Sequence, residues 1–203
     1  MVDLVYVIAS LALAMGFHEA MHAATASALG DPTARAMGRI SLNPLRHIDP
    51  ITTVLLPLFL FFAGLPIFAA ARPVPFNPSL VKYGEYGAAL VGVAGPLTNL
   101  ALATVAGLFL RGTQLSVAEG LGRGILLFMQ VNIGLFVFNM IPFPPLDGSR
   151  LLYAFAPEPL QEVMQRIESM GFLAIGLFIF LLFPFIAPLV SSANDWLFHI
   201  LVG

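Results

Sequence analysis

Residues 4–30 read LVYVIASLALAMGFHEAMHAATASALG, and Glu19 is the only Asp, Glu, Lys or Arg among them. A helix rises about 1.5 Å per residue, so this stretch would extend about 40 Å, more than the hydrocarbon core of a bilayer at about 30 Å. Backbone polar groups in lipid must be satisfied within their own segment, which favours a helix over an irregular chain. The stretch therefore predicts a membrane-spanning helix with polar groups in its interior.

Four further apolar intervals follow along the chain. They contain no Asp, Glu, Lys or Arg and cover residues 50–71, 86–110, 124–146 and 169–194. Beyond Pro184 and Pro188, the tail with Trp196 and His199 predicts an interfacial anchor or a partial sixth helix. Hydrophobic residues make up 59% of the chain and charged residues only 10%, which excludes an ordinary soluble domain. We expect an all-α integral membrane protein with about five to six transmembrane helices.

The connections between these intervals are too short to hold a second domain, so residues 1–203 are expected to form one membrane domain. Residues 37–43 and 72–78, with their asparagine and proline pairs, predict extended segments at the membrane edge. Residues 158–168 place apolar side chains at helical spacing and predict a short interfacial helix. The net charge of −2, without a basic block, makes nucleic acid an unsuitable partner.

The pattern His18-Glu19-Ala20-Met21-His22 is an HExxH motif inside the first apolar interval. Histidines four residues apart share one face of a helix and can bind the same Zn²⁺ ion. Glu19 is suited to take a proton from a zinc-activated water and pass it to a leaving amine. His18 would lie roughly 21 Å from one end of the interval and His22 about 12 Å from the other, where ionisable groups are costly unless they serve a site. The pattern predicts metal-dependent peptide hydrolysis; the alternative is a set of structural hydrogen bonds between helices.

A catalytic zinc site needs a third protein ligand, and the chain contains no cysteine. Asp147 is the preferred candidate because Pro142, Pro144 and Pro145 should break the preceding helix and let the carboxylate turn inward. The remaining candidates are His47, His199 and Glu85, which lie near predicted membrane edges and fit ordinary interfacial positions. The sequence thus predicts one zinc ion bound by His18, His22 and Asp147.

The HExxH motif, followed much later by NMIPFPPLDG at residues 139–148, resembles the site-2 protease family of intramembrane zinc metalloproteases. Several stretches between them resemble the short bacterial and archaeal members that lack a soluble regulatory domain. These are GDPTA at 30–34, GRISLNP at 38–44, HIDP at 47–50, RPVPFNP at 72–78 and AGPLTN at 94–99. The ordered set is far more specific than HExxH alone.

By this resemblance, His18, His22 and Asp147 would bind zinc and Glu19 would be the catalytic acid and base. The substrate would be a transmembrane segment of another membrane protein, cleaved within the lipid bilayer of a prokaryotic cell membrane. Asn99 corresponds to an asparagine of the family, and its carboxamide could donate to the oxyanion or hold the substrate backbone. An interhelical hydrogen bond is the structural alternative for Asn99, and Asn139 could support the site in a similar way.

Two other functions use the same residues. A metal-ion transporter would bind its ion with these histidines and carboxylates, although transport calls for ionisable groups along a path rather than at one level. A catalytically silent protein could bind membrane helices without hydrolysing them, but it would not need Glu19. The extended segments at 37–43 and 72–78 are expected to be either substrate-pairing strands or surface loops.

Overall fold

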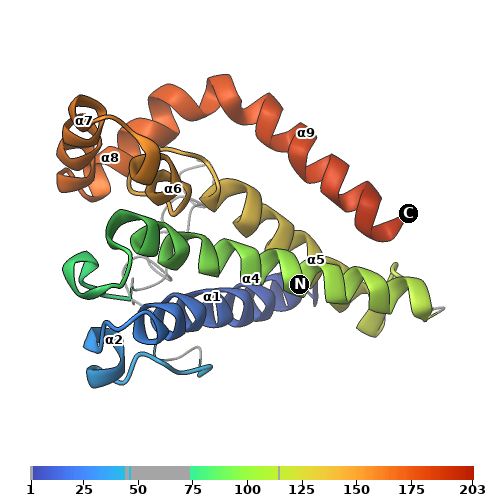
Figure 1. Cartoon of the computed structure of the whole chain (residues 1–203). Coiled ribbons are helices and arrows are strands. Elements are labelled where there is room, and N and C mark those ends of the chain that lie inside the picture. The colour runs from blue at the N-terminus through green and yellow to red at the C-terminus, as the bar shows by residue number, and fades with distance from the viewer. Residues whose placement is uncertain (1, 44–45, 47–73, 114) are drawn as a thin grey trace.

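The computed structural model describes residues 2–43, 46, 74–113 and 115–203. Four helices in this part of the chain are long and apolar enough to cross a membrane: α1 (Val2–Ala28), α4 (Gly84–Gly112), α5 (Gly120–Asn139) and the stretch Leu173–Val202. Within the same residues there is no β-strand, which confirms the all-α membrane fold. The helices α1, α4 and α5 pack against one another, and α9 runs above them in the view of Figure 1 and contacts α4 and α5.

The last spanning stretch is one run of helical segments. It consists of α8 (Phe172–Leu177), a π-helical turn (Phe178–Leu182) and α9 (Phe183–Val202). The π turn ends two residues before Pro184, whose ring nitrogen cannot donate a hydrogen bond, and such turns often occur where the helical hydrogen-bond pattern is interrupted. The tail with Trp196 and His199 therefore continues the helix that begins in the interval 169–194, and it forms no separate sixth helix. The predicted interval 50–71 lies outside the described residues.

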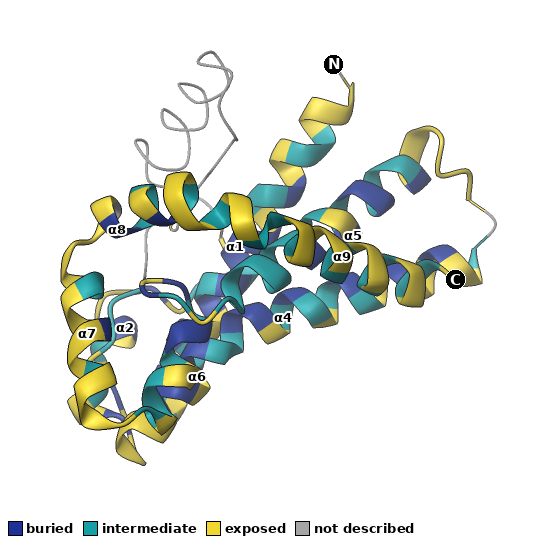
Figure 2. Cartoon of the chain, turned by 90° about the horizontal axis from the view of Figure 1, so that it is seen from above, coloured by how far each residue is buried: buried dark blue, intermediate teal, exposed yellow. Residues whose placement is uncertain are grey.

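Small side chains form the contact between α1 and α4. The buried residues of α1 include Ala14, Gly16, Ala20, Ala23 and Ala26, and those of α4 include Gly87, Ala88, Ala89, Gly92 and Gly95. In lipid there is little hydrophobic force between helices, so close backbone approach through small residues is what holds them together. Larger side chains such as Met129 and Ile133 fill the contact between α4 and α5. Exposed residues are concentrated on α7 and α9 (Figure 2).

A tight loop connects α5 to α6 (Gly148–Phe155) and replaces the end of the interval predicted at 124–146. The prolines at positions 142, 144 and 145 explain why the helix stops at Asn139. A glycine is needed at position 148, where the loop packs back against the end of α5, because a Cβ atom there would lie 2.4 Å from the carbonyl oxygen of Met140. The loop therefore places Asp147 directly before α6, where the two ends of the turn are in close contact.

The short helices gather at one end of the bundle: α2 (Thr33–Ala36), α6, α7 (Glu158–Ser169) and α8 (Figure 1). Helix α7 confirms the helix predicted at 158–168. Residues 39–43 and 74–77 lie outside helices but form no strand. The positions 72 and 73 of the second predicted extended segment lie outside the described residues.

Asp31 attaches the segment 74–77 to the turn after α1. Its side chain is fully buried; Oδ1 accepts from the backbone N–H and hydroxyl of Thr33 at 2.9 and 2.5 Å, and Oδ2 accepts from the N–H of Asn77 at 2.6 Å. Burial by itself raises the pKa of this carboxyl, but the donors from Thr33 and Asn77 outweigh it and leave the pKa below its ordinary value. The charged form is thus the one that holds the two segments together.

The substitution Asp31→Asn should destabilise the protein by about 1–3 kcal/mol, because an amide nitrogen would face one of the N–H donors. A lowered native pKa gives a stabilising contribution that is present above the ordinary carboxyl pKa and is lost as the pH falls through the native value. Thermal unfolding in detergent between about pH 3 and 7 should therefore show a smaller loss of stability at acid pH in the variant than in wild type. Asp195→Asn, which removes a carboxylate of α9, is the charge control. Equal acid sensitivity of Asp31→Asn and wild type would contradict the assignment.

Candidate metal centre

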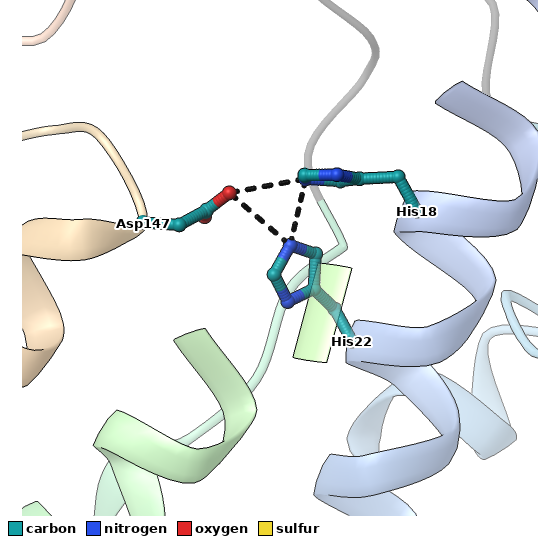
Figure 3. A group of neighbouring side chains, drawn as sticks. All are labelled: His18, His22 and Asp147. Carbon is teal, nitrogen blue, oxygen red and sulfur yellow. Dashed lines mark hydrogen bonds and ion pairs between the residues drawn. The ribbon is translucent and has the colours of Figure 1, made fainter. Parts of the chain in front are cut away.

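His18 and His22 lie one turn apart on α1, and Asp147 reaches them from the loop before α6 (Figure 3). The Nε2 atoms of the two histidines are 3.0 Å apart. The Asp147 Oδ2 atom lies 3.0 Å from His18 Nε2 and 3.4 Å from His22 Nε2. Both histidines are buried and the aspartate is partly buried. The tertiary fold thus brings together residues that are 129 positions apart in the chain.

The other ring nitrogen of each histidine is held by a hydrogen bond. His22 Nδ1 donates to the backbone carbonyl of Val91 on α4 at 2.7 Å, and His18 Nδ1 donates to Asn99 Oδ1 at 2.5 Å. An imidazole with its proton on Nδ1 alone presents the lone pair of Nε2, and both Nε2 atoms face each other and the Asp147 carboxylate. A metal ion placed between these three atoms could bind all of them.

The donor set fits zinc. Two imidazole nitrogens and one carboxylate oxygen are a common protein contribution to a catalytic zinc site, and a tetrahedral ion with bonds of about 2.0–2.1 Å holds its ligand atoms about 3.3 Å apart. The three separations of 3.0, 3.0 and 3.4 Å are close to that spacing. Among the described residues, these three side chains are the only group of histidines and carboxylates arranged to hold a metal ion.

The other ligand candidates lie elsewhere. Glu85 is in the first turn of α4, and His199 is in the last turn of α9 beside a separate cavity of about 390 Å³. His47 lies outside the described residues. The geometry therefore favours Asp147 as the third ligand.

Glu19 is half-buried next to His18 and contacts the segment 74–77. Its Oε2 atom accepts a hydrogen bond of 3.0 Å from the backbone N–H of Val74. The segment is thereby attached at one end to Glu19 and at the other, through Asn77, to Asp31. The sequence pattern indicated an extended stretch here, but only the structure shows that it runs beside the HExxH motif.

The Asn99 carboxamide contacts the histidine rather than the open side of the site. Its Oδ1 faces His18, and its Nδ2 donates to the Ala14 carbonyl at 3.3 Å and to Asn132 Oδ1 at 2.9 Å. Both Nδ2 hydrogens thus have acceptors, which leaves none for an oxyanion. The structure favours the interhelical hydrogen-bonding alternative for Asn99. Asn139 donates to the Leu135 carbonyl of its own helix.

Sequence reasoning did not identify Asn132, Val91 or Gly95. Asn132 is a single carboxamide within a long apolar run, a signal that could have marked it as a buried polar contact. Gly95 is part of the AGPLTN stretch, but only the structure shows that a Cβ atom there would lie 2.4 Å from His22 Nε2 and 2.6 Å from His18 Nε2. The backbone contact of Val91 leaves no signal in the sequence, because any residue has a carbonyl group.

Comparison with known proteins agrees with this centre. The family model described as peptidase family M50 matches residues 111–183, which include Asp147. The chain is 37% identical to YwhC of Bacillus subtilis, a protein assigned as a zinc metalloprotease, over 94% of this chain and 88% of the relative. The chain belongs to peptidase family M50, the site-2 protease family.

A second relative is Rip2 of Mycobacterium tuberculosis, also assigned as a zinc metalloprotease. The identity is 31% over 97% of this chain and 71% of the relative. No solved structure matches the chain significantly. Membership of the M50 family makes the chain a zinc metalloprotease and a multi-pass membrane protein, so the predicted enzyme class and metal are confirmed.

Proposed function

We propose that this M50 protein is an intramembrane endopeptidase that hydrolyses peptide bonds in or near transmembrane segments of other membrane proteins. The observation that carries the proposal is the group of His18, His22 and Asp147, buried between helices long enough to span a bilayer, with Glu19 beside it. A site surrounded by membrane-spanning helices is more accessible to a substrate that is itself embedded in the bilayer than to a water-soluble one. Two bacterial relatives support a place in the prokaryotic cell membrane.

In this proposal His18, His22 and Asp147 bind the zinc ion. When bound, zinc would act as a Lewis acid that polarises the scissile carbonyl and activates water as a nucleophile at neutral pH. The Val91 carbonyl and the Asn99 carboxamide keep both imidazoles in the tautomer that presents Nε2. These contacts orient the ligands before substrate arrives, so little reorganisation is needed during the reaction.

Glu19 is the proposed acid and base. It follows His18 directly on α1, and its half-buried carboxylate can reach groups on the side of the helix that faces the segment 74–77. It would accept a proton from the attacking water and deliver that proton to the nitrogen of the leaving amine. The N–H of Val74 holds the carboxylate in place through Oε2, leaving its other oxygen for proton transfer.

The substrate is proposed to lie along residues 74–77 as an unwound strand. A helical peptide bond is shielded and its carbonyl is already hydrogen-bonded, so the substrate must be extended before it reacts. The segment 74–77 is outside any helix, and its hydrogen bonds to Glu19 and Asp31 set it next to the proposed base. Backbone pairing with such a segment would recognise a substrate without demanding one side-chain sequence.

The substitution Asp147→Ala tests the site. We expect purified protein in liposomes to lose at least about 100-fold in zinc affinity and to lose cleavage of tagged transmembrane substrates, because one of three ligands is removed. Asp195→Ala is a matched control, since Asp195 is a carboxylate of α9 outside the group. Cleavage that survives Asp147→Ala would contradict the proposal. Zinc flux across the liposomes without any cleavage by wild type would favour a transporter instead.

A further inference from the structure

A line of buried carboxamides runs from the metal centre into the middle of the helix bundle. Asn99 on α4 and Asn132 on α5 are both fully buried within spanning helices. Asn99 Oδ1 lies 2.5 Å from His18 Nδ1, and Asn99 Nδ2 donates to Asn132 Oδ1 at 2.9 Å. Asn132 Nδ2 in turn donates to the Phe128 carbonyl of its own helix at 2.8 Å.

Each carboxamide has one end that accepts and one end that donates, so the line has a direction. It ends at the Phe128 carbonyl, which can only accept, and this orients the amide of Asn132 with Nδ2 toward α5. The oxygen of Asn132 then faces Asn99 and requires an N–H there, which turns the oxygen of Asn99 toward His18. His18 must carry its proton on Nδ1, and its Nε2 lone pair is left for a metal ion.

The contact from Asn132 is the stronger of the two that orient Asn99. The other acceptor of Asn99 Nδ2 is the Ala14 carbonyl at 3.3 Å, a longer hydrogen bond than the 2.9 Å one to Asn132. Without Asn132, Asn99 could rotate by half a turn and present Nδ2 to His18 Nδ1. That orientation favours the tautomer with its proton on Nε2, which leaves this atom no lone pair for the metal.

We propose that Asn132 is a positioning residue that acts through Asn99 to hold His18 in its metal-binding tautomer. The proposal rests on the zinc site described above, and it adds the helix α5 to α1 and the loop before α6, which carry the ligands. It also gives a reason for a carboxamide in the apolar interior of α5. Asn132 itself contacts none of the three proposed ligands in the described structure.

The test measures zinc affinity by competition with a chelator, apart from any cleavage assay. We expect Asn132→Leu to weaken zinc binding about 10-fold and Asn99→Leu about 10–100-fold. The double variant should bind zinc no more weakly than Asn99→Leu alone, because Asn132 acts only through Asn99. Asn194→Leu is the matched control: Asn194 also bonds to a carbonyl of its own helix, at 2.8 Å, and should leave the affinity unchanged.

Thermal unfolding with and without zinc separates positioning from general stability. A positioning residue changes the rise in melting temperature that zinc produces, whereas a purely structural one lowers the melting temperature of both forms alike. Asn132→Ala, with less bulk in the helix contact, repeats the test if the leucine variant does not fold.

Two results would overturn the proposal: wild-type zinc affinity in both Asn132 variants, or an equal loss caused by Asn132→Leu with and without Asn99. A wild type that binds zinc but cleaves nothing would contradict the proposed protease function and leave this inference intact.

Discussion

The substitution Glu19→Gln is expected to slow peptide cleavage by about 10²–10⁴-fold, the usual contribution of a general acid and base. Glutamine has the size of glutamate and can still accept the hydrogen bond from Val74, so the segment 74–77 should keep its place. It cannot accept a proton from water at neutral pH. The loss should therefore fall on the chemical step rather than on folding or metal binding.

Cleavage of a tagged transmembrane substrate in liposomes, together with zinc content per chain, measures this effect. Zinc should stay near the wild-type level because Glu19 is not among the three proposed ligands. Glu85→Gln is the control, since Glu85 lies in the first turn of α4 and outside the metal centre. Cleavage by Glu19→Gln at the wild-type rate would refute the assigned role of Glu19.

The substitution Gly95→Ala is expected to weaken zinc binding and to reduce cleavage by about 100-fold or more, although it adds a single methyl group. The new Cβ atom would lie 2.4 Å from His22 Nε2 and 2.6 Å from His18 Nε2, far inside van der Waals contact. Either the imidazoles rotate away from Val91 and Asn99, or α4 moves away from α1. Both changes separate the atoms that would bind the metal.

Helix propensity cannot produce this result, because alanine favours a helix more than glycine does. Gly112→Ala is the matched control on the same helix, since a Cβ atom at position 112 would have no neighbour within 4 Å. Zinc content and cleavage of both variants decide the matter. A Gly95→Ala protein with one zinc ion per chain and normal cleavage would show that the packing of α4 on α1 is looser than described.

Much of the membrane fold could be predicted because lipid restricts the choices of the chain. Apolar intervals of sufficient length must be helices, and those at 4–30 and 86–110 correspond to α1 and α4 within two residues at each end. The apolar interval 124–146 extends beyond the end of α5 at Asn139, because hydropathy alone does not mark where the proline loop begins. The tail was misjudged because a π-helical turn accommodates Pro184, so the helix continues to Val202.

The site divides in the same way between local and long-range determinants. His18, Glu19 and His22 are set by the period of one helix, so four residues of spacing suffice to predict their common face. The prediction of Asp147 rested on setting aside the other ligand candidates and on the proline loop. Its distance of 3.0 Å from His18 results from the tertiary fold. Asn99 was predicted either to contact the oxyanion or the substrate backbone or to form an interhelical hydrogen bond, and the structure favours the last of these by bonding it to His18.

Local sequence is therefore sufficient to predict the described membrane-spanning helices, the HExxH face and the chemical types available for a metal. Each of these depends on neighbouring residues in one segment, where helical geometry and the insolubility of charges in lipid act directly. Three further features are visible in the three-dimensional structure alone: Gly95 lies against the histidines, the Val74 N–H bonds to Glu19, and Asn132 accepts a hydrogen bond from Asn99. These are contacts between separate helices and loops, and they arise from packing that no single segment encodes.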